Sequence, residues 1–427
     1  MLRKEQNDLI TQTGPKTDMG DLFRRYWIPA LLAEELPSND CAPVRVKLLS
    51  ERLIAFRDSE GRLGLIDEFC PHRGASLWFG RNEKCGLRCP YHGWKFDFTG
   101  QCIEVPSEPV ESGFKEKIKL TSYPLVERGN VLWTYMGAPE NIPPLPEWEF
   151  ATVPADQSFI SKRYQESNWL QAMEGGIDSS HVSFLHSGDL ESDPLFKGAA
   201  GNKYNIADMQ PHFEVVESDG GLYIGARRNA EDGNYYWRIT QWVMPSFTMV
   251  PPRGGYSVHG HFWIPIDDEN CWAWSYDYHP TRKLTEAERD AMKQGKGVHV
   301  KHKPGTYFPL ASKENDYLMN RDAQRRNSTY SGIEGIAMQD ASLQESMGPI
   351  VDRTKENLVS TDNGIIMARH RLLKAAKELK KGVQPPGVSP EHQKVRSASV
   401  ILPPDRPFQD AARESLAVRK GVAPASV

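Results

Sequence analysis

The sequence lacks the features that would place it in a membrane or on a nucleic acid. No stretch approaches the roughly 20 apolar residues that a spanning helix needs, and the start of the chain, MLRKEQND, has no apolar core of a signal peptide. There is no long basic run, and the net charge is only −4. We therefore expect a cytoplasmic protein with neither nucleic acid nor membrane as its partner.

Cysteine is scarce, and no glycine-rich dinucleotide fingerprint is present. Six cysteines in 427 residues are too few for a disulfide framework, and in a reducing compartment four of them are expected to be free thiols: Cys41, Cys85, Cys102 and Cys271. Without the fingerprint, the chain is not expected to bind a dinucleotide itself. Its length exceeds that of one compact core, which predicts two domains.

Two short loops each present one cysteine and one histidine. Sixteen residues separate the first loop, Cys-Pro-His, from the second, Cys-Pro-Tyr-His, and a glycine close behind each histidine lets the backbone turn tightly. Two thiolates and two imidazoles could hold a tetrahedral zinc. A Cys-x-His loop matched with a Cys-x-x-His loop is, however, the ligand set of a Rieske [2Fe–2S] centre. We predict such a cluster on Cys70, His72, Cys89 and His92.

A second pair of imidazoles follows about a hundred residues downstream. On an ideal helix Glu174, Asp178 and His181 share one face, whereas His186 lies about 140° round the axis from His181. Both imidazoles reach one ion only if the helix ends or loosens between them. The alternative is a surface helix with scattered polar residues. Imidazole with carboxylate suits Fe(II), and the pattern therefore predicts half of a metal site.

Such a site needs one more anionic ligand to become a facial triad. The later part of the chain offers several carboxylates in helical or turn contexts, and their pattern alone does not choose among them: Glu334, Asp340, Glu345, Asp352, Glu356 and Asp362. Most are expected to be solvated helix charges.

Rieske loops followed by Glu-x3-Asp-x2-His-x4-His resemble the Rieske non-haem iron aromatic ring-hydroxylating oxygenases. The run NWLQAMEGGIDSSH, residues 168–181, is similar to their phthalate dioxygenase-type oxygenase component, and the resemblance extends from about Gly14 to about Leu373. One departure is Gly175, where many relatives have Asn. The resemblance selects Asp340, in its Gln-Asp context, and so implies a mononuclear Fe(II) held by His181, His186 and Asp340.

The resemblance also implies an activity and partners. Such an oxygenase takes electrons through its cluster and uses O2 at the iron to oxidise a small aromatic substrate. We expect cis-dihydroxylation of an aromatic carboxylate of the phthalate or benzoate kind, and the alternative is a monooxygenase or O-demethylase acting on an aryl ether. The electrons are expected from a separate NADH-dependent flavin/[2Fe–2S] reductase.

Asp178 is expected to have a role of its own. Three residues before His181, it can accept from that ligand's second ring N–H, and its other oxygen could accept from a Rieske histidine. The resemblance implies cyclic homotrimers, or dimers of trimers, in which that histidine is His92 of a neighbouring chain.

The expected fold class is α+β. Strand-like alternation from Val44 predicts an N-terminal all-β Rieske domain, and later strands predict a catalytic domain with an antiparallel sheet covered by helices, of the helix-grip type. The expected divisions are a helical segment (1–28), the Rieske domain (29–146), the catalytic domain (147–380) and a Pro-rich arm (381–427). The arm is expected to lie on another subunit or to be partly disordered.

Between residues 235 and 279 the chain holds twelve aromatic residues in forty-five. This predicts an aromatic core face, part of which lines an apolar pocket beside the iron. His259 and His261 alternate along one strand and are interpreted as structural, because no carboxylate accompanies them at a matched spacing. Cations near this region could clamp a carboxylate or lie at the surface: Arg227, Arg228, Arg238 and Arg253.

Overall fold

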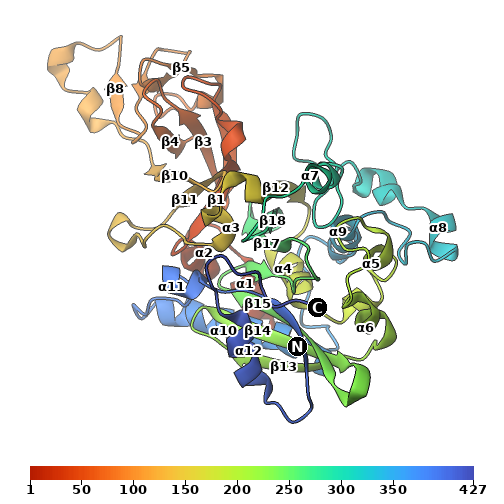
Figure 1. The fold of residues 1–427 in the computed structure, drawn as a ribbon. Coiled ribbons are helices and arrows are strands. Elements are labelled where there is room, and N and C mark those ends of the chain that lie inside the picture. The colour runs from red at the N-terminus through yellow and green to blue at the C-terminus, as the bar shows by residue number, and fades with distance from the viewer.

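The first part of the chain folds into short antiparallel strands, as the alternating pattern predicts. The computed structural model describes residues 1–427 (Figure 1). The strands of this part are β1 (Trp27–Leu32), β2 (Val44–Leu48), β3 (Glu51–Arg57), β4 (Leu63–Asp67), β5 (Arg81–Glu83), β6 (Gly86–Arg88), β7 (Lys95–Phe96), β8 (Cys102–Glu104), β9 (Ser122–Tyr123), β10 (Leu125–Arg128) and β11 (Val131–Tyr135).

These strands form three small sheets, ordered β2-β3-β4-β9, β5-β6-β7-β8 and β1-β11-β10. The predicted hairpin joins β3 to β4. Its turn is held by the buried carboxylate of Asp58, which accepts from the backbone N–H groups of Glu60 at 3.0 Å and Arg62 at 2.9 Å. Side chains that hydrogen-bond the backbone two residues on favour such turns, which explains why this short polar segment reverses the chain.

The second part is built on one large antiparallel sheet, which runs β12-β18-β17-β16-β15-β14-β13 with β19 paired to β15. Its strands are β12 (Ser158–Gln165), β13 (His212–Glu217), β14 (Gly221–Asn229), β15 (Tyr235–Val243), β16 (Phe247–Met249), β17 (Val258–Pro265), β18 (Cys271–Tyr278) and β19 (Ala398–Leu402).

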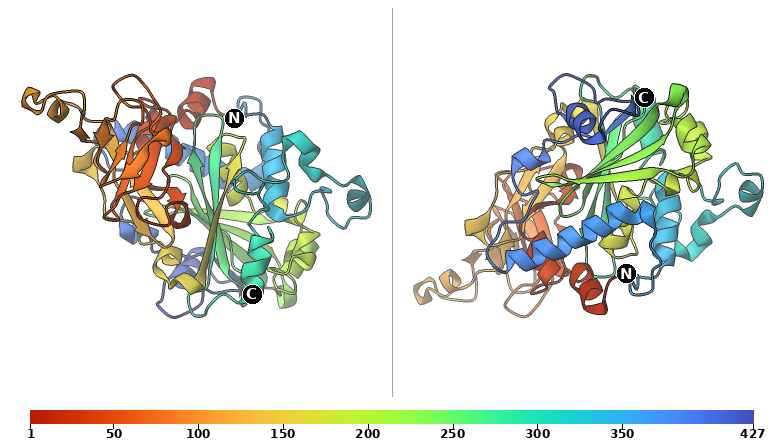
Figure 2. Two further views of the ribbon diagram at one scale, coloured as in Figure 1. Left: turned by 90° about the horizontal axis from the view of Figure 1, so that it is seen from above. Right: turned by 90° about the horizontal axis from the view of Figure 1, so that it is seen from below.

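Helices cover this sheet, and α10 contacts β13 and β14 (Figure 2, right). The predicted α+β class, an all-β domain followed by a helix-covered antiparallel sheet, is confirmed. The helices are α1 (Lys4–Thr11), α2 (Asp18–Phe23), α3 (Glu149–Thr152), α4 (Trp169–Ile177), α5 (Asp189–Ser192), α6 (Asn202–Ala207), α7 (Glu286–Lys293), α8 (Arg321–Arg325), α9 (Ile336–Ser346), α10 (Asn363–Leu379), α11 (Pro390–Gln393) and α12 (Phe408–Leu416).

The N-terminal helices pack on the second domain. Thr17 caps α2 by accepting the backbone N–H of Gly20 at 3.1 Å. Both α1 and α2 contact α10, and β1 then leads the chain into the first domain by pairing with β11.

The C-terminal segment is not a separate arm. Although it is rich in proline, its apolar run Ala398–Leu402 forms β19, which pairs residue by residue with the first half of β15. Apolar side chains of α12, including Phe408, then pack on β15, where the Phe408 and Trp237 rings stack at 4.3 Å. Burial of this run supplies the free energy that ordering the segment requires.

One apolar core joins the two domains. A cluster of 51 buried residues runs from β1 and β11 into the large sheet, where Trp133 and Phe262 meet edge to face at 5.6 Å. A second cluster of 11 buried residues lies under the cysteine-bearing loops. The part of the first domain that carries β5 to β8 projects away from the sheet and from α4 (Figure 1).

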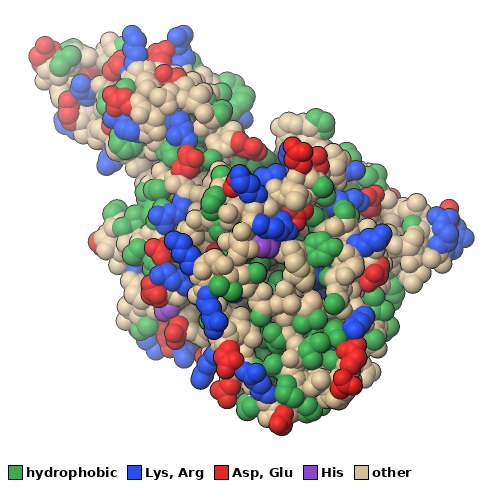
Figure 3. Space-filling model, viewed as in Figure 1, with side chains coloured by type: hydrophobic (Ala, Val, Ile, Leu, Met, Phe, Trp, Pro, Cys, Tyr) green, Lys and Arg blue, Asp and Glu red, His purple; other side chains and the backbone are tan.

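Charges of both signs are mixed over the face shown in Figure 3, and basic side chains gather at the tip formed by α8. Every helix falls short of the length and apolar character that crossing a bilayer requires.

Candidate functional site: two metal centres

The two cysteine loops have the same backbone geometry. In the first, the N–H of Gly74 donates to the carbonyl of Cys70 at 2.8 Å, and in the second Gly93 donates to Cys89 at 3.0 Å. Both glycines have a positive φ, +74° and +76°, which a residue with a Cβ rarely adopts. The predicted need for glycine behind each histidine is therefore met by the structure.

The four predicted ligands divide into a buried and an exposed pair. Cys70 and Cys89 are almost fully buried, and desolvation, together with the neighbouring Cys89, raises the pKa of Cys70 to about 11. His72 lies at the surface and His92 is half-buried, with their ring centroids 4.4 Å apart. Two adjacent interior thiols and two adjacent outer imidazoles fit a Rieske [2Fe–2S] cluster, with thiolates on one iron and histidines on the other.

The second predicted centre forms where α4 ends. Asn168 caps its start by accepting the N–H of Leu170 at 3.0 Å, and the helix stops at Ile177. The chain then turns through a 3₁₀ segment, His181–Ser183, before it reaches His186. The condition set by the sequence, that the helix must end before both imidazoles can meet, is fulfilled.

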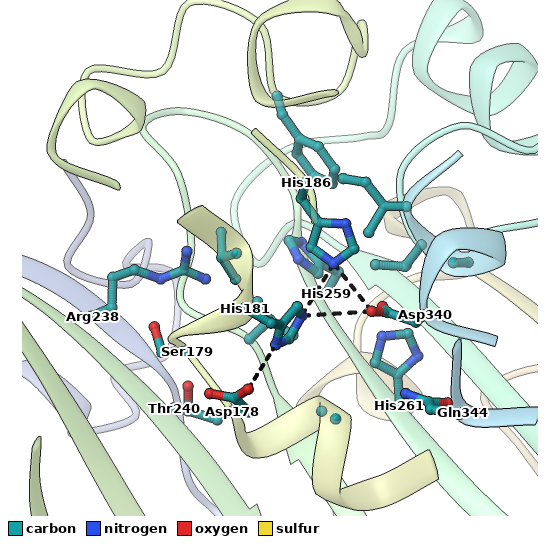
Figure 4. A pocket seen from close by; sticks show the side chains of 18 of the residues that line it. Asp178, Ser179, His181, His186, Arg238, Thr240, His259, His261, Asp340 and Gln344 are labelled. Atoms are coloured by element: carbon teal, nitrogen blue, oxygen red, sulfur yellow. Dashed lines mark hydrogen bonds and ion pairs between the residues drawn. The ribbon is translucent and has the colours of Figure 1, made fainter. Parts of the chain in front are cut away.

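Three side chains from α9 and this turn converge (Figure 4). The Nε2 atoms of His181 and His186 are 3.1 Å apart, and they lie 3.5 Å and 3.2 Å from Oδ1 of Asp340. One ligand atom from each residue falls within 4.8 Å of the others. Two imidazoles and one carboxylate are the donor set of a facial triad for non-haem iron, so the residues present fit that metal.

Hydrogen bonds orient both imidazoles. Nδ1 of His181 lies 3.3 Å from Oδ2 of Asp178, and Nδ1 of His186 lies 2.7 Å from Oε1 of Gln339. Gln339 in turn donates to Asp189 at 2.6 Å. Burial opposes ionisation of Asp178, but hydrogen bonds from His181 and Ser180 outweigh it and lower its pKa to about 2. The carboxylate is therefore charged and can hold His181 by its second ring nitrogen.

Glu174 does not belong to this centre, although an ideal helix would place it with Asp178 and His181. Its carboxylate is buried and accepts from Arg353 at 3.1 and 2.9 Å and from Arg369 at 2.6 Å. The prediction of a shared face fails because the helix ends at Ile177, so its periodicity does not extend to Asp178 and His181.

Replacing Glu174 with Ala should lower the free energy of unfolding by about 3–5 kcal/mol, because the buried Arg353 would lose its carboxylate partner and Arg369 would keep only Glu356. Equilibrium chemical denaturation measures the change. Glu60→Ala removes an exposed ion pair with Arg62 and should cost less than about 1 kcal/mol. Equal losses in the two variants would mean that the buried network does not stabilise the domain.

A cavity opens beside the triad. Of the four candidate arginines, only Arg238 and Arg253 line it, and both are nearly fully buried. Arg227 stacks on Tyr235 at 4.1 Å, and Arg228 donates to backbone carbonyls, including that of Ser179 at 2.9 Å. The wall also includes Arg163 of β12, which the sequence patterns did not single out.

His259 and His261 line the same cavity, so they are not merely core residues, although neither joins the ligand cluster. Burial, followed by the charge of Arg163, lowers the pKa of His261 to about 3. Burial, followed by the charge of Arg253, depresses the pKa of His259 well below its usual value. Both are neutral at pH 7 and add hydrogen-bonding capacity to the wall without adding charge.

Comparison with known proteins finds a family for each domain. Residues 26–124 match the Rieske [2Fe-2S] domain family, and residues 134–416 match the family described as LigXa C-terminal domain like. The chain resembles the crystal structure of dicamba monooxygenase bound to dicamba with a TM-score of 0.57, at 19% identity, over 84% of this chain and 99% of that one. At this identity the likeness shows the fold alone.

Three curated relatives cover most of the chain. The 3-chlorobenzoate-3,4-dioxygenase oxygenase subunit of Comamonas testosteroni is 37% identical over 92% of this chain and 93% of its own. The phthalate 4,5-dioxygenase oxygenase subunit of Pseudomonas putida is 36% identical, over 88% and 86%. The 5,5'-dehydrodivanillate O-demethylase oxygenase subunit of Sphingobium sp. (strain NBRC 103272 / SYK-6) is 30% identical, over 91% and 84%.

A Rieske domain joined to a catalytic domain that carries a two-histidine, one-carboxylate triad defines a Rieske non-haem iron oxygenase. The chain belongs to the aromatic ring-hydroxylating members of that class, of the phthalate dioxygenase type. Its cofactors are a Rieske [2Fe–2S] cluster and a mononuclear iron. The zinc alternative for the cysteine loops is thereby excluded.

Proposed function

We propose that the protein is the oxygenase component that cis-dihydroxylates an aromatic carboxylate of the phthalate or benzoate kind. The observation that carries the proposal is the pair Arg238 and Arg253, which line the cavity beside the triad without a carboxylate partner. Burial, followed by the charge of Arg238, lowers the pKa of Arg253 to about 9. A bound carboxylate would supply the missing counter-charge and accept hydrogen bonds from both guanidinium groups.

Iron held by His181, His186 and Asp340 would supply the oxidation of the ring by O2. The chain's own residues position the reactants. The arginines hold the carboxylate end of the substrate, and Val250, Trp263 and Ile336 give the cavity apolar wall for a ring. Trp263 and Ile336 are buried, so a ring held against them would be shielded from water on that side.

The relatives support this assignment and also the alternative. Two of them act, by name, on chlorobenzoate and phthalate, which are aromatic carboxylates. The third is named as an O-demethylase and supports the second candidate, removal of a methyl group from an aryl ether. Product analysis under labelled O2 with phthalates, benzoates and methoxybenzoates separates the two. Two labelled oxygen atoms in a cis-diol support dihydroxylation, and a demethylated phenol supports the alternative.

Replacing Arg253 with Leu should weaken the binding of aromatic carboxylates by about 2–5 kcal/mol, since a desolvated charge pair is lost. Neutral aromatic substrates should bind as before. Arg227→Leu is the matched control, because Arg227 stacks on Tyr235 and does not line the cavity. Equal effects on charged and neutral substrates, at both Arg238 and Arg253, would remove the carboxylate assignment and favour the O-demethylase.

The proposal includes the partners of the chain. Electrons would come from a separate NADH-dependent flavin/[2Fe–2S] reductase. The chain would assemble as a homotrimer, or a dimer of trimers, in which His92 of one chain meets Asp178 of the next. In support, the part of the first domain with β5 to β8 projects away from α4 of its own chain (Figure 1).

The carboxylate of Asp178 is suited to a second partner. Oδ1 already accepts from the backbone N–H of Ser180 at 2.7 Å and from its hydroxyl, while Oδ2 accepts only from His181. The free acceptor position is therefore on Oδ2, the same oxygen that orients His181. The side chain is 21% exposed, so a histidine from a second chain can approach it.

A further inference from the structure

A chain of hydrogen bonds fixes the direction of one amide beside the triad. It begins at Arg163, whose guanidinium can only donate. Its Nη2 donates to Oε1 of Gln165 at 3.1 Å, so the opposite, nitrogen end of the Gln165 amide must act as a donor. That nitrogen donates to Oε1 of Gln344 at 2.8 Å and to Ser167 at 3.1 Å.

The polarity of Gln344 follows from this chain. Because its oxygen accepts from Gln165, its nitrogen carries the two hydrogen atoms that face the other way. Gln165 is fully buried and Gln344 is 7% exposed, so water cannot easily reverse the arrangement. A flipped amide at either residue would place two donors against each other, which the buried setting makes unfavourable.

The nitrogen of Gln344 has no acceptor in the protein. Gln344 lines the cavity, four residues after Asp340 and therefore on the same face of α9. The amide lies against Gly175 of α4, where an added Cβ would stand only 2.3 Å from Nε2. The absence of a side chain at Gly175 is what leaves room for the amide of Gln344.

We propose that Gln344 is a specificity-determining residue, whose amide N–H groups bind a hydrogen-bond acceptor on the substrate ring, such as a second carboxylate or an ether oxygen. The inference rests on the proposed function, in which Arg238 and Arg253 hold one carboxylate. In Figure 4, Arg238 and Gln344 lie on opposite sides of the triad. A ring held at one end by the arginines would meet the amide at a substituent on its other side.

The test measures equilibrium binding to the anaerobic holoenzyme by calorimetry. The probes are benzoate, the three benzenedicarboxylates and the three methoxybenzoates. In the unchanged protein, at least one substituted probe should bind tenfold or more tightly than benzoate. In Gln344→Leu the ratio of these two affinities should fall below twofold. The substituted probe would lose the hydrogen bond to its second group, whereas benzoate has no such group and would bind as before.

Gly175→Ala provides an independent variant. Alanine favours a helix over glycine, so the variant should fold, yet its Cβ would displace the amide of Gln344. It should lower the same ratio. Leu343→Ala, at an exposed position of α9, is the matched control and should leave the ratio unchanged. Iron content, measured in each variant, should stay constant.

An unchanged ratio in Gln344→Leu, or an equal loss of affinity for benzoate and the substituted probe, would overturn the role of Gln344. So would an unchanged protein that binds no substituted probe more tightly than benzoate. If the unchanged protein binds none of the aromatic carboxylates, the proposed function itself fails, and that outcome is distinct from the others.

Discussion

Replacing His181 with Ala should abolish product formation and lower the iron content from about three atoms per chain to about two, while the visible absorption of the cluster remains. The expected result follows from the geometry of the triad. The Nε2 atoms of His181 and His186 and Oδ1 of Asp340 lie within 3.5 Å of one another, so removal of one imidazole leaves two ligands of three. Iron analysis, the absorption spectrum and product assays measure the three quantities.

His370→Ala is the matched control, because His370 is exposed on α10. It should change neither iron content nor turnover. Cys89→Ala is the reciprocal variant and should remove the cluster absorption together with about two iron atoms. It should also destabilise the first domain, since cluster binding is coupled to folding. If His181→Ala kept full iron content and turnover, the mononuclear centre would be wrongly assigned.

Replacing Asp178 with Asn should reduce turnover by about 10- to 100-fold, the range expected when a residue that orients a metal ligand is lost. Both metals and substrate binding should be retained. The amide is uncharged, and it presents only one acceptor atom in place of the carboxylate. It cannot both hold His181 and receive a proton from a histidine of a second chain. The rate at which substrate is oxidised after the cluster has been reduced, followed by stopped-flow spectroscopy, measures the effect.

A mixture of two inactive variants tests whether the second histidine comes from another chain. Asp178→Asn keeps its cluster, and His72→Ala keeps Asp178 and the triad. The two chains are co-expressed with different affinity tags and purified in succession, so that only mixed assemblies are assayed. If His92 of one chain meets Asp178 of the next, some interfaces join an intact cluster to an intact triad, and activity should return. No recovery in verified mixed assemblies would mean that each chain uses its own cluster.

The sequence predicts much of the fold because local patterns decide it. The alternation in β2, β3 and β4 and the polar turn at Asp58–Gly61 appear where the pattern places them. The turn that brings His181 and His186 together was also predictable, since an imidazole five residues after another cannot share a helical face with it. Each of these features depends only on residues that are close together in the sequence. A short segment is therefore enough to predict it.

Long-range pairing was not predictable in the same way. Glu174 looked like part of the metal site because its partners, Arg353 and Arg369, lie almost two hundred residues downstream. Asp340 was one of six similar carboxylates until the family resemblance selected it. Arg227 and Arg228 lie on β14, and no local pattern shows that they are kept out of the cavity that Arg238 and Arg253 line. The proline content of the tail concealed β19, whose partner strand lies about 160 residues upstream.

The tail has a practical consequence for handling the protein. The hydroxyls of Ser397 and Ser399 donate to the carbonyls of Val250 at 2.7 Å and Pro252 at 2.8 Å, and the N–H of Gly254 donates to Val427 at 3.1 Å. The segment that the tail holds, residues 250–254, carries Arg253, which lines the cavity. An affinity tag fused after Val427 would therefore disturb the part of the cavity wall that carries Arg253. A tag before Met1 would leave from the opposite side of the molecule (Figure 2) and is the better choice for binding measurements.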